Sequence, residues 1–176
     1  NLVKVTDVLG NISTYKYDNA NRVTEFTNAN NITTKYSYDK NGNMLSQTDG
    51  NGKVSSFEYD ALNRLVIATN PLKTAQKTAY DLSGNISSVE NALGAVTKYE
   101  YNGTGKPVQT IDGEGNIYKM SYDSNGNNTE IIAPDGSKTA MTYDGNQRLV
   151  KNVLASGLET NYEYDSLNRI AKETNN

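Results

Sequence analysis

The chain has 176 residues, enough for one to one-and-a-half ordinary domains, and a formal net charge of only −3. It contains no Cys and no His, which excludes disulfides, zinc sites with Cys or His ligands, thiol nucleophiles and triads with an imidazole base. The 17 basic and 20 acidic residues are spread along the chain, so nucleic acid is not an expected partner, and no apolar run approaches the length of a membrane span.

The first predicted element is a short strand at residues 2–6, which is half of the unit that follows it. From there a Tyr-Asp pair recurs eight times at a spacing of 21 residues, without an insertion or deletion. Only the fifth copy changes the pair, with Asn102 in place of Asp. The structural signature of the repeat is Tyr17, Asp18, Tyr38, Asp39, Tyr59, Asp60, Tyr80, Asp81, Tyr101, Tyr122, Asp123, Tyr143, Asp144, Tyr164 and Asp165. A fixed period of this kind is typical of repeat proteins.

A β-strand is predicted immediately before each Tyr-Asp pair. In the second copy Thr34, Tyr36 and Tyr38 alternate with Thr, Lys and Ser, which is the two-residue period of a strand in residue types that strands favour. A helix is disfavoured because no apolar stripe at helical spacing persists from one copy to the next.

Each Tyr-Asp pair leads into a tight turn, as at residues 39–43, because Asp can bond backbone N–H groups two residues on and Gly or Asn tolerates positive φ. A second strand follows, as at residues 64–69, and then a second turn, as at residues 112–115. The sequence thus predicts an all-β meander of about 17 short antiparallel strands. No linker interrupts it, so residues 1–176 are expected to form a single array of about eight 21-residue repeats.

A single unit has too few large side chains to stay folded alone, so stacking on its neighbours must stabilise it. On one face, Tyr rings should alternate with aliphatic residues of the strand between them, such as Val23 and Leu65. We expect the burial of this stripe to hold the structure together. Copies that depart from the pattern, above all the fifth, are expected to be looser or bulged.

A unit of the form Tyr-x-Tyr-Asp-x-x-Gly-Asn or Tyr-x-Tyr-Asp-x-x-Asn-Arg closely resembles the YD repeat of the Rhs family. Residues 36–45 and 57–65 show the motif best, and the resemblance covers essentially the whole chain. The family includes bacterial polymorphic toxins, insecticidal toxin complexes, Gram-positive wall-associated proteins and the animal teneurins. The resemblance implies that the hairpin meander curls into a spiral sheet, as a segment of a β-shell.

The function that the resemblance implies is a structural scaffold rather than an enzyme. It would be a shell segment of a secreted or cell-surface bacterial protein that encapsulates or displays a C-terminal toxin or effector. The alternative is a carbohydrate-binding module for adhesion at a cell surface, because YD repeats have been linked to carbohydrates. The implied partners are the neighbouring YD repeats, an encapsulated toxin domain and cell-surface glycans.

The chain is expected to be a fragment of a longer protein. None of Pro71, Pro107 and Pro134 follows an Asp, so the Asp-Pro core signature of toxin-carrying members has no counterpart. About 17 strands spaced about 4.8 Å apart would cover less than one turn of a toxin-sized shell. The outermost strands of an isolated fragment would expose unpaired backbone groups, so copies are expected to associate end to end. A strictly monomeric light-scattering profile at high concentration would contradict this.

No catalytic, cofactor-binding or metal-binding residue is assigned. The turns at 39–43 and 123–127 resemble the start of a calcium loop, but its twelfth position holds Gly50 or Pro134 instead of Glu. Carboxylate pairs are the only acid–base machinery that the composition permits, and the recurring Asp fits a structural role better. Tyr118 is the candidate ligand contact, because the other copies have Thr, Ser or Gln at its offset; core filling is the alternative.

Overall fold

The computed structural model describes all 176 residues and contains 17 β-strands and no helix. It falls into two compact units, residues 1–79 with 89–94 and residues 80–88 with 95–176. The 21-residue period continues through both units, and on this continuity we base the proposal of a single array over residues 1–176. The protein has no helix that is long and apolar enough to cross a membrane.

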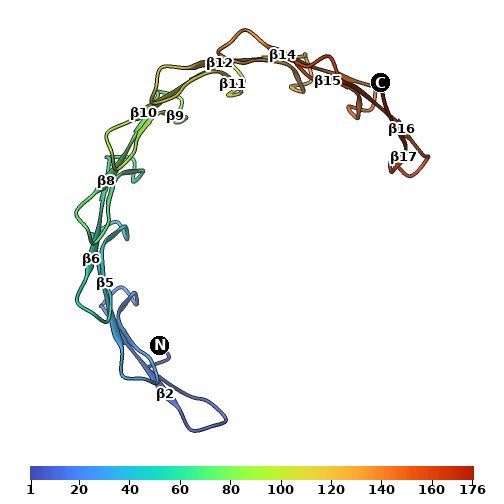
Figure 1. Cartoon of the computed structure of the whole chain (residues 1–176). Helices are drawn as coiled ribbons and strands as arrows, with labels where there is room; N and C mark the ends of the chain where they lie inside the picture. The colour runs from blue at the N-terminus through green and yellow to red at the C-terminus, as the bar shows by residue number, and fades with distance from the viewer. The chain divides into compact units, whose positions relative to one another are not determined.

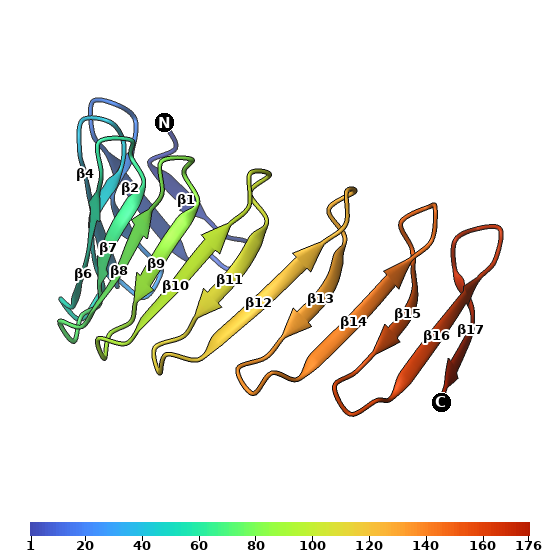
Figure 2. The same ribbon diagram turned by 90° about the horizontal axis from the view of Figure 1, so that it is seen from above.

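Within each unit the strands follow one another as antiparallel hairpins, each pairing with the next along the chain (Figures 1 and 2). The predicted all-β hairpin meander is therefore confirmed. The first unit holds β1 (Lys4–Thr6), β2 (Ile12–Tyr17), β3 (Val23–Thr27), β4 (Thr33–Tyr38), β5 (Met44–Thr48), β6 (Val54–Tyr59) and β7 (Leu65–Thr69). The second holds β10 (Val96–Tyr101), β11 (Pro107–Ile111), β12 (Ile117–Tyr122), β13 (Asn128–Ile132), β14 (Lys138–Tyr143), β15 (Leu149–Val153), β16 (Glu159–Tyr164) and β17 (Ile170–Asn175). Strands β8 (Ala75–Tyr80) and β9 (Ile86–Glu90) contribute residues to both units.

Both kinds of turn are closed by the same backbone hydrogen bonds. In the first, the N–H of Asp18 donates to the carbonyl of Arg22, and the N–H of Asn21 donates back to the carbonyl of Asp18, both at 3.0 Å. The residue three places after the turn's first residue has positive φ, for example 62° at Asn21 and 98° at Gly42. Asn and Gly adopt this left-handed conformation most readily, which is why they recur at this position.

Lys73 occupies the left-handed position of the turn between β7 and β8, with φ of 66°. Lysine has a Cβ that crowds the following carbonyl in this conformation. We expect Lys73→Gly to raise the free energy of unfolding by about 0.5–1 kcal/mol. Chemical denaturation of the two proteins measures the difference. The matched control is Gly94→Lys at the same position of another turn, where φ is 84° and an added Cβ would contact nothing. This variant should lower the free energy of unfolding by a similar amount. Equal stability of all three proteins would contradict the expectation.

A β-bulge interrupts seven of the hairpins at their Tyr. Tyr17 pairs with Val23 whereas Lys16 pairs with Glu25, so Thr24 is an extra residue in β3. Bulges bend a strand and increase its twist. The same shift occurs at Tyr38, Tyr59, Tyr101, Tyr122, Tyr143 and Tyr164. The bulge expected only in irregular copies is thus a regular part of the repeat.

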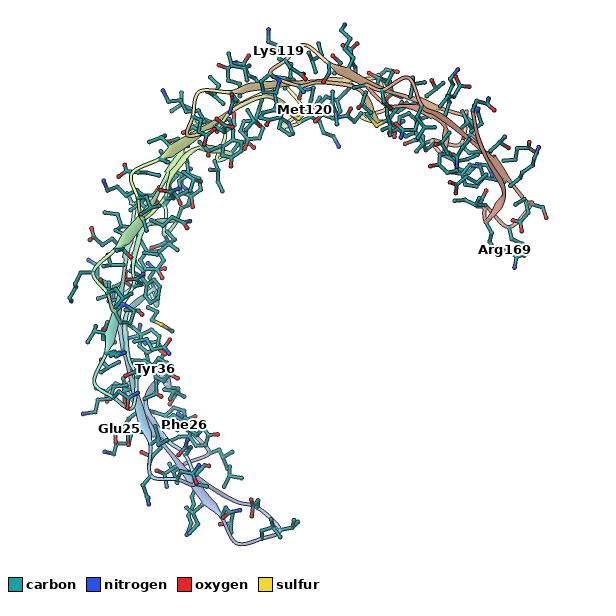
Figure 3. The ribbon with its side chains drawn as sticks, in the orientation of Figure 1. Glu25, Phe26, Tyr36, Lys119, Met120 and Arg169 are labelled. Carbon is teal, nitrogen blue, oxygen red and sulfur yellow. The ribbon has the colours of Figure 1, made fainter.

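The register gives the sheet two different faces. Tyr15 lies opposite Phe26, which lies opposite Thr34, whereas Lys16 pairs with Glu25 on the other side. Figure 3 shows Phe26 and Tyr36 on one side of the ribbon and Glu25 on the other. In the same way, Met120 and Lys119 lie on opposite sides of the ribbon. We call the side that carries the repeated Tyr residues the aromatic face and the other side the charged face. Each unit, taken by itself, bends toward its aromatic face (Figure 3).

The sheet has no buried hydrophobic core. No hydrophobic side chain is buried, and Thr160, with 8% of its surface exposed, is the one buried polar residue. The strand residues of the aromatic face are mostly half-buried. The expectation of a buried stripe is corrected in this respect: the stripe exists, but nothing within the chain covers it, because the sheet is a single layer. Its stability must come from many partial contacts along the array.

Candidate functional site: the Tyr-Asp hairpins and their aromatic face

The Asp of each pair organises the turn that follows it. The backbone N–H groups of Ala20 and Arg22 donate to Oδ1 of Asp18, at 2.9 and 3.0 Å. Its second oxygen, Oδ2, accepts from Nε of Arg22 at 2.7 Å. The same pattern of two backbone donors and one side-chain donor recurs at Asp39, Asp60, Asp81, Asp123, Asp144 and Asp165. The side-chain donor is Arg where the turn ends in Arg and Asn where it ends in Gly-Asn.

These hydrogen bonds set the acidity of the carboxyl groups. In Asp18, donation from the backbone and the side chain of Arg22 holds the pKa below its usual range, against a smaller opposing effect of burial. In Asp39 the largest cause of the lowered pKa is the side-chain amide of Asn43. A carboxylate that accepts three hydrogen bonds is stabilised in its charged form and serves to hold the turn. No group of three or more acidic side chains that could hold a metal ion comes together in the structure.

In most repeats the Tyr of the pair ties its hairpin to the preceding one. The hydroxyl of Tyr38 donates to the backbone carbonyl of Val23, fifteen residues earlier, at 2.9 Å. Burial of this hydroxyl raises its pKa. Equivalent bonds join Tyr17 to Leu2, Tyr101 to Ile86, Tyr122 to Pro107 and Tyr164 to Leu149, at 2.7 to 2.9 Å. Two copies differ: Tyr59 makes no such bond, and the hydroxyl of Tyr143 lies 3.9 Å from the sulfur of Met141. The sequence pattern did not predict this contact, although the accepting residue lies at a constant offset of fifteen positions before the Tyr.

An arginine reinforces some of these junctions. The guanidinium of Arg22 lies over the ring of Tyr38, 4.8 Å from its centroid, and donates to the carbonyl of Asp39 at 2.6 Å. Arg148 lies over the ring of Tyr164 in the same way, at 4.6 Å. Arginine favours this stacked position because its planar, weakly hydrated cation is attracted to the aromatic π-face. A turn that ends in Arg can therefore join two repeats as well as close its own hairpin.

The aromatic face contains open hollows between side chains. One of about 330 Å³ is lined by Tyr15, Val23, Phe26, Tyr36 and Tyr38, with the rings of Tyr15 and Phe26 5.0 Å apart. A second, of about 580 Å³, lies in the other unit, where Met120 and Tyr122 form its apolar side and Lys106 lies on its polar side. Side chains of a partner could enter such hollows, but none of them holds a set of converging charged groups.

Tyr118, the candidate ligand contact, lies in β12 opposite Thr110. By alternation along the strand it shares the aromatic face with Met120 and Tyr122. It is 39% exposed, and its hydroxyl forms no hydrogen bond within the protein. The residue is therefore partly accessible, and its role as a ligand contact remains a proposal.

Cross-strand ion pairs mark the charged face. Lys16 contacts Glu25 at 2.7 Å and Lys138 contacts Glu130 at 3.1 Å, each between neighbouring strands. Further pairs join Lys77 to Glu90, Lys151 to Glu159 and Lys172 to Glu163. Exposed pairs of this kind add little stability individually. They keep this face hydrated, while the opposite face carries the Tyr rings.

Asn128 is the polar exception in the row of residues that pair with the repeated Tyr. It lies opposite Tyr122, where other copies place an aliphatic residue such as Val23 or Leu149. Its Oδ1 is buried and has no hydrogen-bond partner. A buried polar atom without a partner lowers stability.

We therefore expect Asn128→Leu to raise the free energy of unfolding by about 1–2 kcal/mol, because it removes the unsatisfied oxygen and adds apolar contact. Urea denaturation followed by circular dichroism measures the change. The matched control is Leu149→Asn, which introduces the same exception in the next repeat and should destabilise. A variant at Asn128 that is no more stable than the original chain would show that the oxygen costs nothing.

Comparison with known proteins shows to which family of repeats these hairpins belong. The RHS Repeat family model matches residues 1–33, 17–54 and 38–75, and the Teneurin YD-shell model matches residues 66–140. The chain belongs to the Rhs/YD-repeat family. This family consists of repeats that build a structural shell, in agreement with the geometry described above. Among curated proteins none matches the chain.

Solved structures show the same fold for the YD repeats. TcdB2-TccC3 without its hypervariable C-terminal region matches 98% of this chain with a TM-score of 0.76 and 13% identity. TcdB2-TccC3 matches 99% with a TM-score of 0.75 and 14% identity, and a mutated Tc holotoxin pore from Photorhabdus luminescens matches 99% with 0.73 and 16%. The YD-repeat chain spans about a tenth of the length of these proteins, covering 10%, 11% and 11% of them.

Proposed function

We propose that this chain is a wall segment of a shell in a secreted or surface-exposed Rhs-type protein, and that the shell encloses or displays a toxin or effector. The observation that carries the proposal is the one-sided sheet: each repeat puts Tyr on the aromatic face and ionic groups on the charged face. The match of 98% of the chain to TcdB2-TccC3 supports this role.

The energetics of the sheet agree with an enclosing wall. A single layer with no buried hydrophobic side chain leaves its aromatic face half-covered, and an exposed apolar face is a usual sign of an interaction surface. The bend of each unit toward that face makes it the inner side (Figure 3). Polypeptide held inside would cover this surface, while the ion pairs of the charged face would remain in water.

Protease protection tests the enclosing role on the whole protein that carries this segment. We expect its effector region to resist a protease in the intact protein and to be digested when produced alone. A second experiment places charges on the inner side, with the double variant Tyr36→Glu and Met120→Glu. The matched control places the same charges on the outer side, with Ser37→Glu and Ser121→Glu. Loss of protection or of the bound effector in the first variant alone is expected. An effector region that is equally sensitive in all proteins would overturn the proposal.

Tyr118 supports a second proposal, that the aromatic face contacts carbohydrate. An exposed ring with an unpaired hydroxyl can stack on a sugar and donate a hydrogen bond. A glycan array tests this with the chain and with Tyr118→Ala, using circular dichroism to verify the fold. Binding that disappears in Tyr118→Ala would support the proposal, and the absence of any glycan signal would remove it while leaving the shell role untouched.

A further inference from the structure

The chain contains four Asn-Gly pairs, at residues 41–42, 51–52, 102–103 and 125–126. In such a pair the backbone nitrogen of Gly can attack the side-chain carbonyl carbon of Asn, because Gly has no Cβ to obstruct the approach. Asparagine is for this reason a thermally labile residue. The four pairs have the same chemistry, so the surrounding structure decides which of them reacts.

The glycine N–H is engaged in three of the pairs. It donates to the carbonyl of the turn's first residue, which holds the proton that the attacking nitrogen must lose. These glycines are Gly42, Gly52 and Gly126, with N–O distances of 3.3, 2.9 and 3.0 Å. Gly103 differs because Asn102 is itself the first residue of its turn. The N–H of Gly103 forms no hydrogen bond within the protein, and the residue is exposed.

The side chain of Asn102 is also different from the other three. Its Oδ1 accepts three hydrogen bonds, from the backbone N–H of Thr104 at 3.0 Å, the hydroxyl of Thr104 at 2.8 Å and the backbone N–H of Lys106 at 3.0 Å. The side-chain oxygens of Asn41, Asn51 and Asn125 accept none from the protein. Donors around a carbonyl oxygen polarise it and stabilise the negative charge that develops there when a nucleophile adds.

We propose that Asn102 is a site of spontaneous deamidation, one product of which restores the Tyr-Asp pair of the fifth repeat. The nitrogen of Gly103 forms a bond to Cγ of Asn102, the Cγ–Nδ2 bond breaks, and ammonia leaves with the proton that Gly103 loses. The product is a cyclic succinimide. Water then opens the ring to give either aspartate or its β-linked isomer at position 102. No oxidant, cofactor or enzyme is needed.

The product has a precedent in the same chain. Asp144 is followed by Gly145, and its carboxylate accepts from the backbone of Asn146 and Arg148 and from Nε of Arg148. An aspartate at position 102 would find the equivalent backbone donors in place. Lys106 stands four residues on, at the position from which Arg or Asn donates to the second oxygen in the other turns, and its ammonium forms no ion pair in the structure. Where the ring opens to aspartate, the reaction would thus convert the one Tyr-Asn pair into the form that the other seven repeats have, whereas the β-linked isomer would lengthen the backbone of this turn.

Incubation of the folded chain at mildly alkaline pH, followed by peptide mapping with mass spectrometry, tests the proposal. Each deamidation raises the mass of its peptide by about 1 Da. We expect position 102 to react about tenfold faster than the other three sites, because only there are the donors and the free N–H combined. In urea, where the turns are lost, the four rates should become similar. Asn51 or Asn125 reacting as fast as Asn102 in the folded chain would overturn the proposal.

Two variants separate the chemistry from general mobility of the turn. Thr104→Val removes the hydroxyl donor and should slow the reaction at position 102 alone, whereas Thr104→Ser should retain the rate. Gly103→Ala hinders the attacking nitrogen and should abolish it. Unchanged deamidation in both Thr104→Val and Gly103→Ala, in chains with an unaltered circular dichroism spectrum, would show that the site does not act as described.

Discussion

Replacement of Tyr38 by Ala is expected to lower the free energy of unfolding by about 2–3 kcal/mol. The substitution removes a half-buried ring that lines the hollow with Tyr15 and Phe26, its hydrogen bond to Val23 and its contact with Arg22. This loss of free energy is smaller than that expected for a fully buried aromatic residue, because nothing covers the outer side of the ring. Equilibrium denaturation by urea, followed by far-ultraviolet circular dichroism, measures the change.

Tyr38→Phe separates the ring from the hydroxyl. It should cost about 1 kcal/mol, since it leaves the carbonyl of Val23 without its donor. The matched control is Tyr59→Phe, because the hydroxyl of Tyr59 makes no hydrogen bond to the preceding hairpin, and stability should hardly change. If both Phe variants were equally destabilised, the hydroxyl-to-carbonyl bond would not be what joins the repeats.

Acidification is expected to unfold the array over a narrow pH range. The carboxyl groups of the Tyr-Asp turns have pKa values below their usual range, because backbone and side-chain donors stabilise the charged form. A group with a lowered folded-state pKa contributes stability that is fully present above its unfolded-state pKa, about 3.9 for Asp. This stability is lost as the pH falls through the folded-state pKa. Because the same carboxylate recurs in seven turns, the losses should add up.

The pH dependence can be reduced without breaking the turn. In the turns that begin with Asn28 and Asn70, a neutral side-chain oxygen accepts the same two backbone N–H groups. Asp60→Asn should therefore keep the hairpin and lose both its pair with Arg64 and its share of the acid sensitivity. Thermal melts between neutral pH and pH values below 4 would measure this. Melting temperatures of the original chain that do not fall with pH would contradict the role given to these carboxylates.

The repeat made most of the fold predictable. The turn predicted at residues 39–43 lies between β4 and β5, and the strand predicted at residues 64–69 coincides with β7 within one residue. Such accuracy is unusual for a strand, and it comes from eight copies of one pattern, which average out the ambiguity of any single copy. The family resemblance followed from the same residues.

The candidate site was only partly predictable. The amino-acid pattern identified Tyr118 as an outlier, and the structure added that the residue is partly exposed. The pattern did not show that Arg22 lies over Tyr38, because this contact joins residues of successive hairpins whose spacing depends on the bulge at Thr24. A bulge is a property of the backbone register between two strands, and many sequences can adopt it.

The sequence by itself determined the period, the strands, the turn chemistry and the alternation that separates the two faces, because each depends on residues a few positions apart. Only the tertiary structure decided how far the stripe of Tyr is covered and which oxygens remain unpaired, as at Asn128. Those properties depend on what lies against each side chain across neighbouring strands and above the sheet. In a single-layer sheet, no second layer packs on the stripe of Tyr residues. The stripe that predicts a buried core is therefore a half-exposed face.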